Sequence, residues 1–92
     1  MKSIDQMKED LKKEGYTDIY EWTDSPNYDY PSHSHKTDTT LIVLKGDITI
    51  TLEGKTKKYS TGEKVIVPAK KEHSAKVGSK GASYLVGEEK VN

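Results

Sequence analysis

Hydrophobic and polar residues alternate over short runs along most of this chain, which is the period of a β-strand with one buried face. From Tyr16 onward such runs recur at close spacing, with turn residues between them. They predict strands over residues 17–22, 39–44, 47–52, 56–60, 64–67, 74–77 and 82–86. Many short strands in one small chain are typical of an all-β fold, and we expect a small β-barrel.

Glycine marks the predicted turns between these strands. The triplets centred on Gly46, Gly54 and Gly62 each separate two hydrophobic runs, and residues 78–81 begin and end with glycine. We expect all four to be turns or loops. The polar, proline-containing stretch at residues 23–32 is expected to be a loop as well.

The first residues follow a helical period instead. Ser3 and Gln6 form a capping box, and Gly15 provides a stop signal. Apolar residues at helical spacing are Ile4, Met7 and Leu11. The sequence therefore predicts a single domain over residues 1–92, with a short amphipathic helix within 1–15 that lies outside a barrel formed by 16–92.

Composition excludes several classes of partner. The chain of 92 residues carries 15 basic and 15 acidic residues, and every basic residue is a lysine. With no net charge and no arginine, we expect no nucleic-acid binding. The sequence contains no run of 18 apolar residues and no apolar core of a secretory signal, so we expect no membrane span and a cytoplasmic protein.

All three histidines of the chain fit the pattern of a metal site. His33 and His35 form an H-x-H pair, and in extended backbone both side chains lie on one face. His73 is distant in sequence, so the hypothesis requires a fold that brings the two segments together. Because the chain has no cysteine, the ligands would be nitrogen or oxygen atoms.

Two motifs in this region resemble those of the cupin superfamily. His33, His35 and Gly46 match the first cupin motif, and the second is matched by Gly62, Pro68 and His73. The resemblance implies a jelly-roll β-barrel with a divalent metal at its centre, bound by His33, His35 and His73. It also implies a small-molecule ligand and a homodimer.

The sequence departs from the cupin motifs at two positions. Thr39 stands where the family usually has a metal-binding glutamate. The nearby Asp38 has the wrong parity to share a face with the histidines unless a β-bulge shifts the strand. Lys70 replaces the glycine of the second motif, which is expected to alter the turn before His73 but to remove no ligand.

Three neutral imidazoles would leave the full charge on a divalent ion. They would also leave coordination positions of the metal open, which is typical of a catalytic site. Iron, zinc, nickel and manganese all remain candidates. The favoured function is a small metal-binding cupin that acts on or binds a small molecule, with possible dioxygenase, isomerase or lyase chemistry. The alternative is a non-catalytic ligand- or metal-binding barrel.

The remaining candidates for the site come from the chain around the histidines. Thr39 could hydrogen-bond a metal-bound water, and Tyr28 or Tyr30, from the expected loop over the barrel mouth, could donate a proton. Tyr20 and Trp22 are interpreted as strand packing or a subunit interface. No carboxylate is placed at the site as a general base. Alternation predicts an apolar interior that contains Leu41, Val43, Ile48, Ile50, Leu52, Val65, Val67, Ala75 and Val77.

Overall fold

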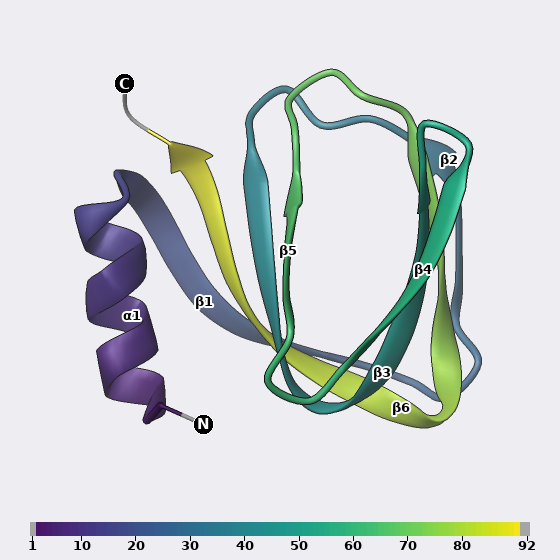
Figure 1. Cartoon of the computed structure of the whole chain (residues 1–92), viewed down its shortest axis with the longest axis horizontal. Coiled ribbons are helices and arrows are strands. Elements are labelled where there is room, and N and C mark those ends of the chain that lie inside the picture. The colour runs from purple at the N-terminus through teal and green to yellow at the C-terminus, as the bar shows by residue number, and fades with distance from the viewer. Residues whose placement is uncertain (1, 91–92) are drawn as a thin grey trace.

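The structure, a computed structural model, describes residues 2–90, so both ends of the predicted 1–92 domain lie outside the described residues. It consists of one helix and a barrel of antiparallel strands (Figure 1), which confirms the predicted fold class. In chain order the elements are α1 (Ile4–Lys13), β1 (Tyr16–Asp24), β2 (Asp29–His33), β3 (Thr39–Leu52), β4 (Lys55–Ser60), β5 (Lys64–Val67) and β6 (His73–Lys90).

Two long strands, β3 and β6, form the frame of the barrel. They pair with each other from Thr40 opposite Gly87 to Leu52 opposite His73. Strands β1 and β5 flank the half of this pair that holds the start of β3, whereas β2 and β4 flank the other half. Figure 1 shows both long strands bending between the halves, so that two sheets face each other as in a jelly roll.

The predicted turn at Gly46 is wrong, because β3 continues through it. The register between β3 and β6 shifts on both sides of Gly46, which has a φ of 76°. A Cβ atom at Gly46 would lie 2.0 Å from the carbonyl oxygen of Gly81. The glycine therefore permits a close approach at the bend where the strand passes from one sheet to the other, rather than a reversal of the chain.

One further predicted loop is wrong, and another is correct only for residues 25–28, which connect β1 and β2. Residues 78–81 lie within β6, where the register shift against β3 absorbs them. The stretch 23–32 contains most of β2, which pairs Tyr30 with Ala75 and His33 with His73. Pro31 lies at the register shift of this strand, a position where proline disturbs few ladder hydrogen bonds.

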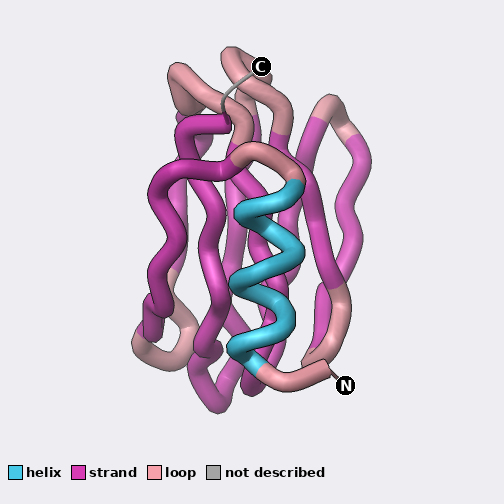
Figure 2. Tube along the Cα trace, turned by 90° about the vertical axis from the view of Figure 1, so that its left-hand side faces the viewer, coloured by secondary structure: helices cyan, strands magenta, loops and turns pink. Residues whose placement is uncertain are grey.

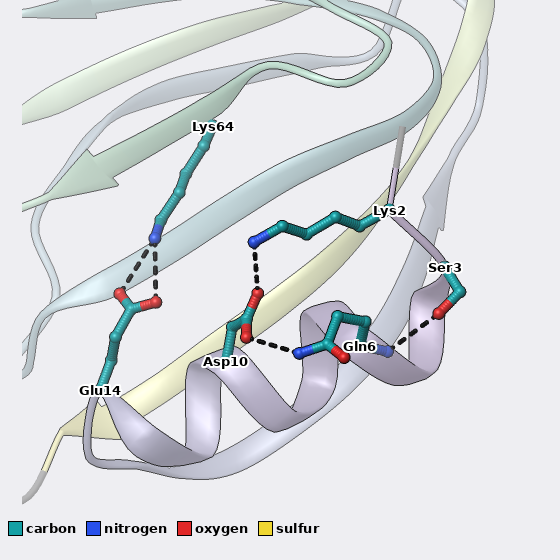
Figure 3. Close-up of polar contacts among 6 residues, drawn as sticks. All are labelled: Lys2, Ser3, Gln6, Asp10, Glu14 and Lys64. Carbon is teal, nitrogen blue, oxygen red and sulfur yellow. Dashed lines mark hydrogen bonds and ion pairs between the residues drawn. The ribbon is translucent and has the colours of Figure 1, made fainter.

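Helix α1 covers the outer face of the sheet that contains β1, as predicted (Figure 2). The Ser3 side chain caps it by accepting a hydrogen bond from the Gln6 backbone N–H at 3.1 Å (Figure 3). The buried Met7 and Leu11 pack in a cluster with other apolar residues, which are Tyr16, Ile42 and Leu85. At the other end of the helix, Glu14 pairs with Lys64 of β5 at 2.9 Å (Figure 3).

Alternation along the strands correctly predicts the inner face of the barrel. The core cluster contains six of the predicted residues, namely Val43, Ile48, Ile50, Val65, Val67 and Val77. Three others are half-buried and pack against it, namely Leu41, Leu52 and Ala75. The chain thus places its apolar residues in two layers, one inside the barrel and one beneath α1.

Candidate metal centre and its cavity

The fold brings the three histidines together at one end of the barrel. His33 ends β2 and pairs directly with His73, the first residue of β6, while His35 lies in the connection to β3. The ring centroids are 4.3 Å apart for His33 and His73, 4.8 Å for His35 and His73, and 4.9 Å for His33 and His35. One nitrogen from each ring lies within 4.8 Å of the others, a spacing that could hold a metal ion.

Each histidine is held by a hydrogen bond at its Nδ1 atom. His33 Nδ1 lies 2.7 Å from the Pro31 carbonyl oxygen, and His73 Nδ1 lies 3.1 Å from that of Lys71. A carbonyl only accepts, so both Nδ1 atoms carry a hydrogen, and the neutral rings have their lone pairs on Nε2. Second partners of this kind fix the orientation of histidine ligands at metal sites.

His35 is held by the Thr39 hydroxyl, whose oxygen lies 3.1 Å from Nδ1. The Nε2 atoms of His33 and His35 are 3.1 Å apart, and since that of His33 has the lone pair, His35 Nε2 donates its hydrogen. The Thr39 hydroxyl then donates to His35 Nδ1. With metal bonds of about 2.0–2.1 Å, two ligand nitrogens on one ion lie about 3 Å apart, so this pair already has the required spacing.

The environment of His35 favours its neutral form. Burial, followed by the nearby His73 and His33 rings, lowers the pKa of His35 from its ordinary value of 6.5. The charge of Glu88 acts in the opposite direction. An imidazole must be neutral to bind a metal, so the lowered pKa keeps His35 in the binding form to lower pH.

Asp38, the carboxylate nearest the missing glutamate, and Lys70, which replaces the glycine of the second motif, both have clear local roles. The Asp38 carboxylate accepts a hydrogen bond from the Ala69 backbone N–H at 2.7 Å, in the connection between β5 and β6. Lys70 adopts a φ of 65°, the left-handed conformation in which glycine is favoured, and its N–H donates to the His35 carbonyl oxygen at 2.8 Å. The altered turn therefore still supports the backbone of His35.

The histidines open onto a cavity of about 250 Å³ inside the barrel. Its walls are mostly apolar, with residues from both sheets such as Leu41, Ile50 and Val86. Thr39 also lines it, beside His35. A largely apolar cavity with a few polar groups is typical of a small-molecule site, and this volume lies below the range for drug-sized ligands.

The structure adds two carboxylates that sequence reasoning missed, because Asp24 and Glu88 both line the cavity. Glu88 Oε1 accepts a hydrogen bond from the Tyr20 hydroxyl at 2.6 Å. The sequence did offer one indication of this position. Asp24 follows Tyr20 and Trp22 at intervals of two residues along β1, so the three side chains share one face of the strand. Alternation alone could not place Asp24 in the cavity, because the pairing of β1 with β6 decides which face of β1 points into the barrel.

The aromatic candidates differ in whether they line the cavity. Tyr30 belongs to β2 rather than to a loop, lines the cavity and donates a hydrogen bond to Asp24 Oδ1 at 2.7 Å. Burial and then this hydrogen bond raise the pKa of Tyr30 to about 12. Tyr28 is half-exposed, lies edge-on to Tyr30 and does not line the cavity. Tyr20 and Trp22 both line it, and Tyr20 also packs against the core.

Comparison with known proteins agrees with this architecture. The model of the cupin domain family matches residues 20–86. A search of curated proteins finds no match. Among solved structures, a protein of unknown function from Rhizobium leguminosarum is similar, with a TM-score of 0.73 and 20% identity over 79% of this chain and 69% of that one.

Two further structures share the fold at low identity. The Schizosaccharomyces pombe Cnp3 cupin domain has a TM-score of 0.71 and 17% identity, over 79% of this chain and 52% of that one. The DMSP lyase DddQ from Ruegeria pomeroyi has a TM-score of 0.70 and 21% identity, over 77% of this chain and 36% of that one. Among the described residues, no helix has the length and apolar character needed to cross a membrane. The family match spans most of the barrel, and the chain therefore belongs to the cupin domain family.

Proposed function

We propose that this protein binds a divalent metal ion through His33, His35 and His73 and acts on a small molecule held in the adjoining cavity. The observation that carries the proposal is that all three Nδ1 atoms have hydrogen-bond partners, while one nitrogen of each ring lies within 4.8 Å of the others. Imidazole suits iron, zinc and nickel, and manganese remains a candidate. A divalent ion with three neutral ligands would supply a Lewis acid with open coordination positions.

Proton transfer is the reaction class that the cavity residues support best. Glu88 lines the same cavity as the histidines and could accept a proton as a general base. Tyr30 also lines it, with its ring centroid 6.2 Å from that of His33. With its pKa raised to about 12 the phenol stays protonated, and to act as a proton donor Tyr30 would exchange its hydrogen bond to Asp24 for one to the substrate. This pairing favours an isomerase or a lyase over a dioxygenase.

The proposal is tested by measuring the metal content of the purified protein and then its metal affinity by titration. A His33→Ala/His73→Ala variant is the control, because it retains one of the chain's three histidines. We expect near-stoichiometric metal in the wild type and none in the variant. Absence of binding after incubation with iron, zinc, nickel and manganese would overturn the proposal.

The alternative function, a non-catalytic binding module, is distinguished by turnover. The metal-loaded protein is assayed against small hydroxy acids, keto acids and amines, with Glu88→Gln and Tyr30→Phe as test variants. Turnover that requires the metal and falls in both variants supports the enzyme. Metal and ligand binding without turnover in any of these assays favours the module.

Two finer expectations belong to the same proposal. We propose a homodimer formed through the edge strand β1, where Trp22 is 54% exposed, and a cytoplasmic location. Light scattering after size-exclusion chromatography tests the first, with Trp22→Gln expected to shift the protein toward the monomer. Cell fractionation tests the second.

A further inference from the structure

Glu88 is a half-buried carboxylate of the cavity whose charge is not offset by a lysine. Its Oε1 atom accepts a hydrogen bond from the Tyr20 hydroxyl at 2.6 Å, and a phenol brings no positive charge. Among the residues that the structure describes, no lysine forms an ion pair with Glu88 and none lines the cavity. Withdrawing a carboxylate from water without a countercharge is costly, so Glu88 indicates a place for a cation.

The strand register sets Glu88 beside a residue that contacts the histidines. Thr40 pairs with Gly87 in the antiparallel ladder of β3 and β6, so the next position of the ladder sets Thr39 opposite Glu88. Both residues line the cavity, and their side chains therefore share the inner face of the sheet. The Cβ atoms of opposite residues lie about 4.5–5.5 Å apart. The Thr39 hydroxyl oxygen is itself only 3.1 Å from His35 Nδ1.

The field of this carboxylate reaches the histidine cluster. Burial is the main influence on the pKa of His35 and lowers it, whereas the charge of Glu88 acts to raise it. In the structure the ligand atoms that lie within 4.8 Å of one another come from the three histidines, and Glu88 bonds Tyr20 instead. Rotation about the bonds of its long side chain would bring the carboxylate to an ion held by the histidines.

We propose that Glu88 is a fourth ligand of the metal centre, supplied by β6. The carboxylate absent from position 39 of β3 would thus come from the neighbouring strand, and its charge would offset part of the charge that three neutral imidazoles leave on the ion. This inference deepens the proposed function and rests on it in one respect, namely that the histidines bind a metal. It is compatible with a base role for Glu88, because a carboxylate bound through one oxygen keeps acceptor sites on the other.

The first experiment titrates the wild type and Glu88→Gln with whichever of iron, zinc, nickel and manganese the wild type binds most tightly. Glutamine keeps the length of the side chain and an oxygen that can accept from Tyr20, so the fold should be retained, and circular dichroism verifies it. We expect the affinity to fall at least about tenfold. Glu89→Gln removes the adjacent exposed carboxylate, which does not line the cavity, and should bind as the wild type does. Equal affinities for the two variants would overturn the proposal.

Chemical rescue distinguishes a ligand from a charge that acts at a distance. The probe is Co²⁺, whose visible absorption reports on its ligands, and Glu88→Ala leaves space that acetate can fill. We expect acetate, but not chloride at the same ionic strength, to raise the Co²⁺ affinity of Glu88→Ala severalfold and to return its spectrum toward that of the wild type. Glu89→Gln and the wild type should show no such difference between the salts. Equal effects of acetate and chloride on Glu88→Ala would contradict direct ligation.

The failure of this inference is distinguishable from that of the proposed function. A wild type that binds none of the metals would overturn both. Metal that is bound by the wild type, lost in His33→Ala/His73→Ala and bound with unchanged affinity by Glu88→Gln would support the histidine site and overturn the ligand role of Glu88 alone. Weakened binding in Glu88→Gln together with rescue of Glu88→Ala by acetate would support both.

Discussion

The Thr39 hydroxyl oxygen lies 3.1 Å from His35 Nδ1, and Thr39 is only 4% exposed. In the structure this hydroxyl donates its hydrogen to Nδ1, because His35 Nε2 donates to His33. To hold a metal ion through Nε2, His35 would need its hydrogen on Nδ1, and the Thr39 hydroxyl would then accept that hydrogen bond. A hydroxyl can either donate or accept this hydrogen bond, whereas an ionised carboxylate can only accept one and an ammonium group can only donate one.

We expect Thr39→Val to lower the metal affinity by about 10- to 100-fold, because the similar side chain leaves His35 Nδ1–H without a buried partner. Titration with zinc or nickel measures the effect. Thr49→Val, on the outer face of the same strand, is the control and should bind as the wild type does. Equal affinities for the two variants would show that Thr39 does not support the site.

The metal-free protein should lose stability as the pH falls below about 6.5, the ordinary pKa of histidine. Because the folded-state pKa of His35 is lowered, the unfolded chain binds more protons between that pKa and 6.5. Stability is therefore fully present above 6.5 and is lost on acidification. Urea unfolding with a chelator, at about pH 7.5 and about pH 5, should show a smaller difference for His35→Gln than for the wild type.

Gly46→Ala and Gly54→Ala form a matched pair, since the two glycines have φ values of 76° and 77°. At Gly54 nothing lies within 4 Å of the added Cβ, so only the left-handed conformation costs stability, about 1–2 kcal/mol. At Gly46 the Cβ meets the Gly81 carbonyl, and we expect a further loss of about 1–3 kcal/mol. Chemical denaturation gives both values, and equal losses would contradict the close approach of β3 and β6.

Lys70→Gly should stabilise the protein by about 0.5–1 kcal/mol, because glycine adopts the positive φ of 65° without the strain of a side chain. The backbone hydrogen bond to His35 does not depend on the side chain, so the metal affinity should not change. Lys70→Ala retains the strain and is the control. A gain of the same size in the alanine variant would attribute the effect to the lysine charge instead.

The sequence predicted those features that depend on local periodicity or on motifs with a fixed residue spacing. The alternation of Val43, Ile48 and Ile50 placed them inside the barrel, and the spacing of His33 and His35 placed both rings near each other. The capping box at Ser3 also predicted where α1 begins. In each case the determining contacts involve neighbours in sequence or a simple period.

The features that the sequence did not reveal depend on pairing between distant segments. In the sequence, Gly46 is compatible with a turn and with a β-bulge. Only the position of the opposing backbone at Gly81 distinguishes the two. Asp24 likewise becomes a cavity residue only because its strand pairs with Ala82, which fixes its inner face. Local sequence carries no information on which partner strand a residue meets.

The pairing of β6 with β1, β2 and β3 also determines when the site can exist during synthesis of the chain. Tyr16 pairs with Lys90, so the first strand finds its partner only after the last has emerged from the ribosome. His33 and His35 likewise wait for β6, because His73 is its first residue, and until β1 pairs with the end of β6 the barrel stays open on that side. Contacts this distant in sequence slow folding, so closure of the barrel and assembly of the three-histidine cluster must follow translation of β6.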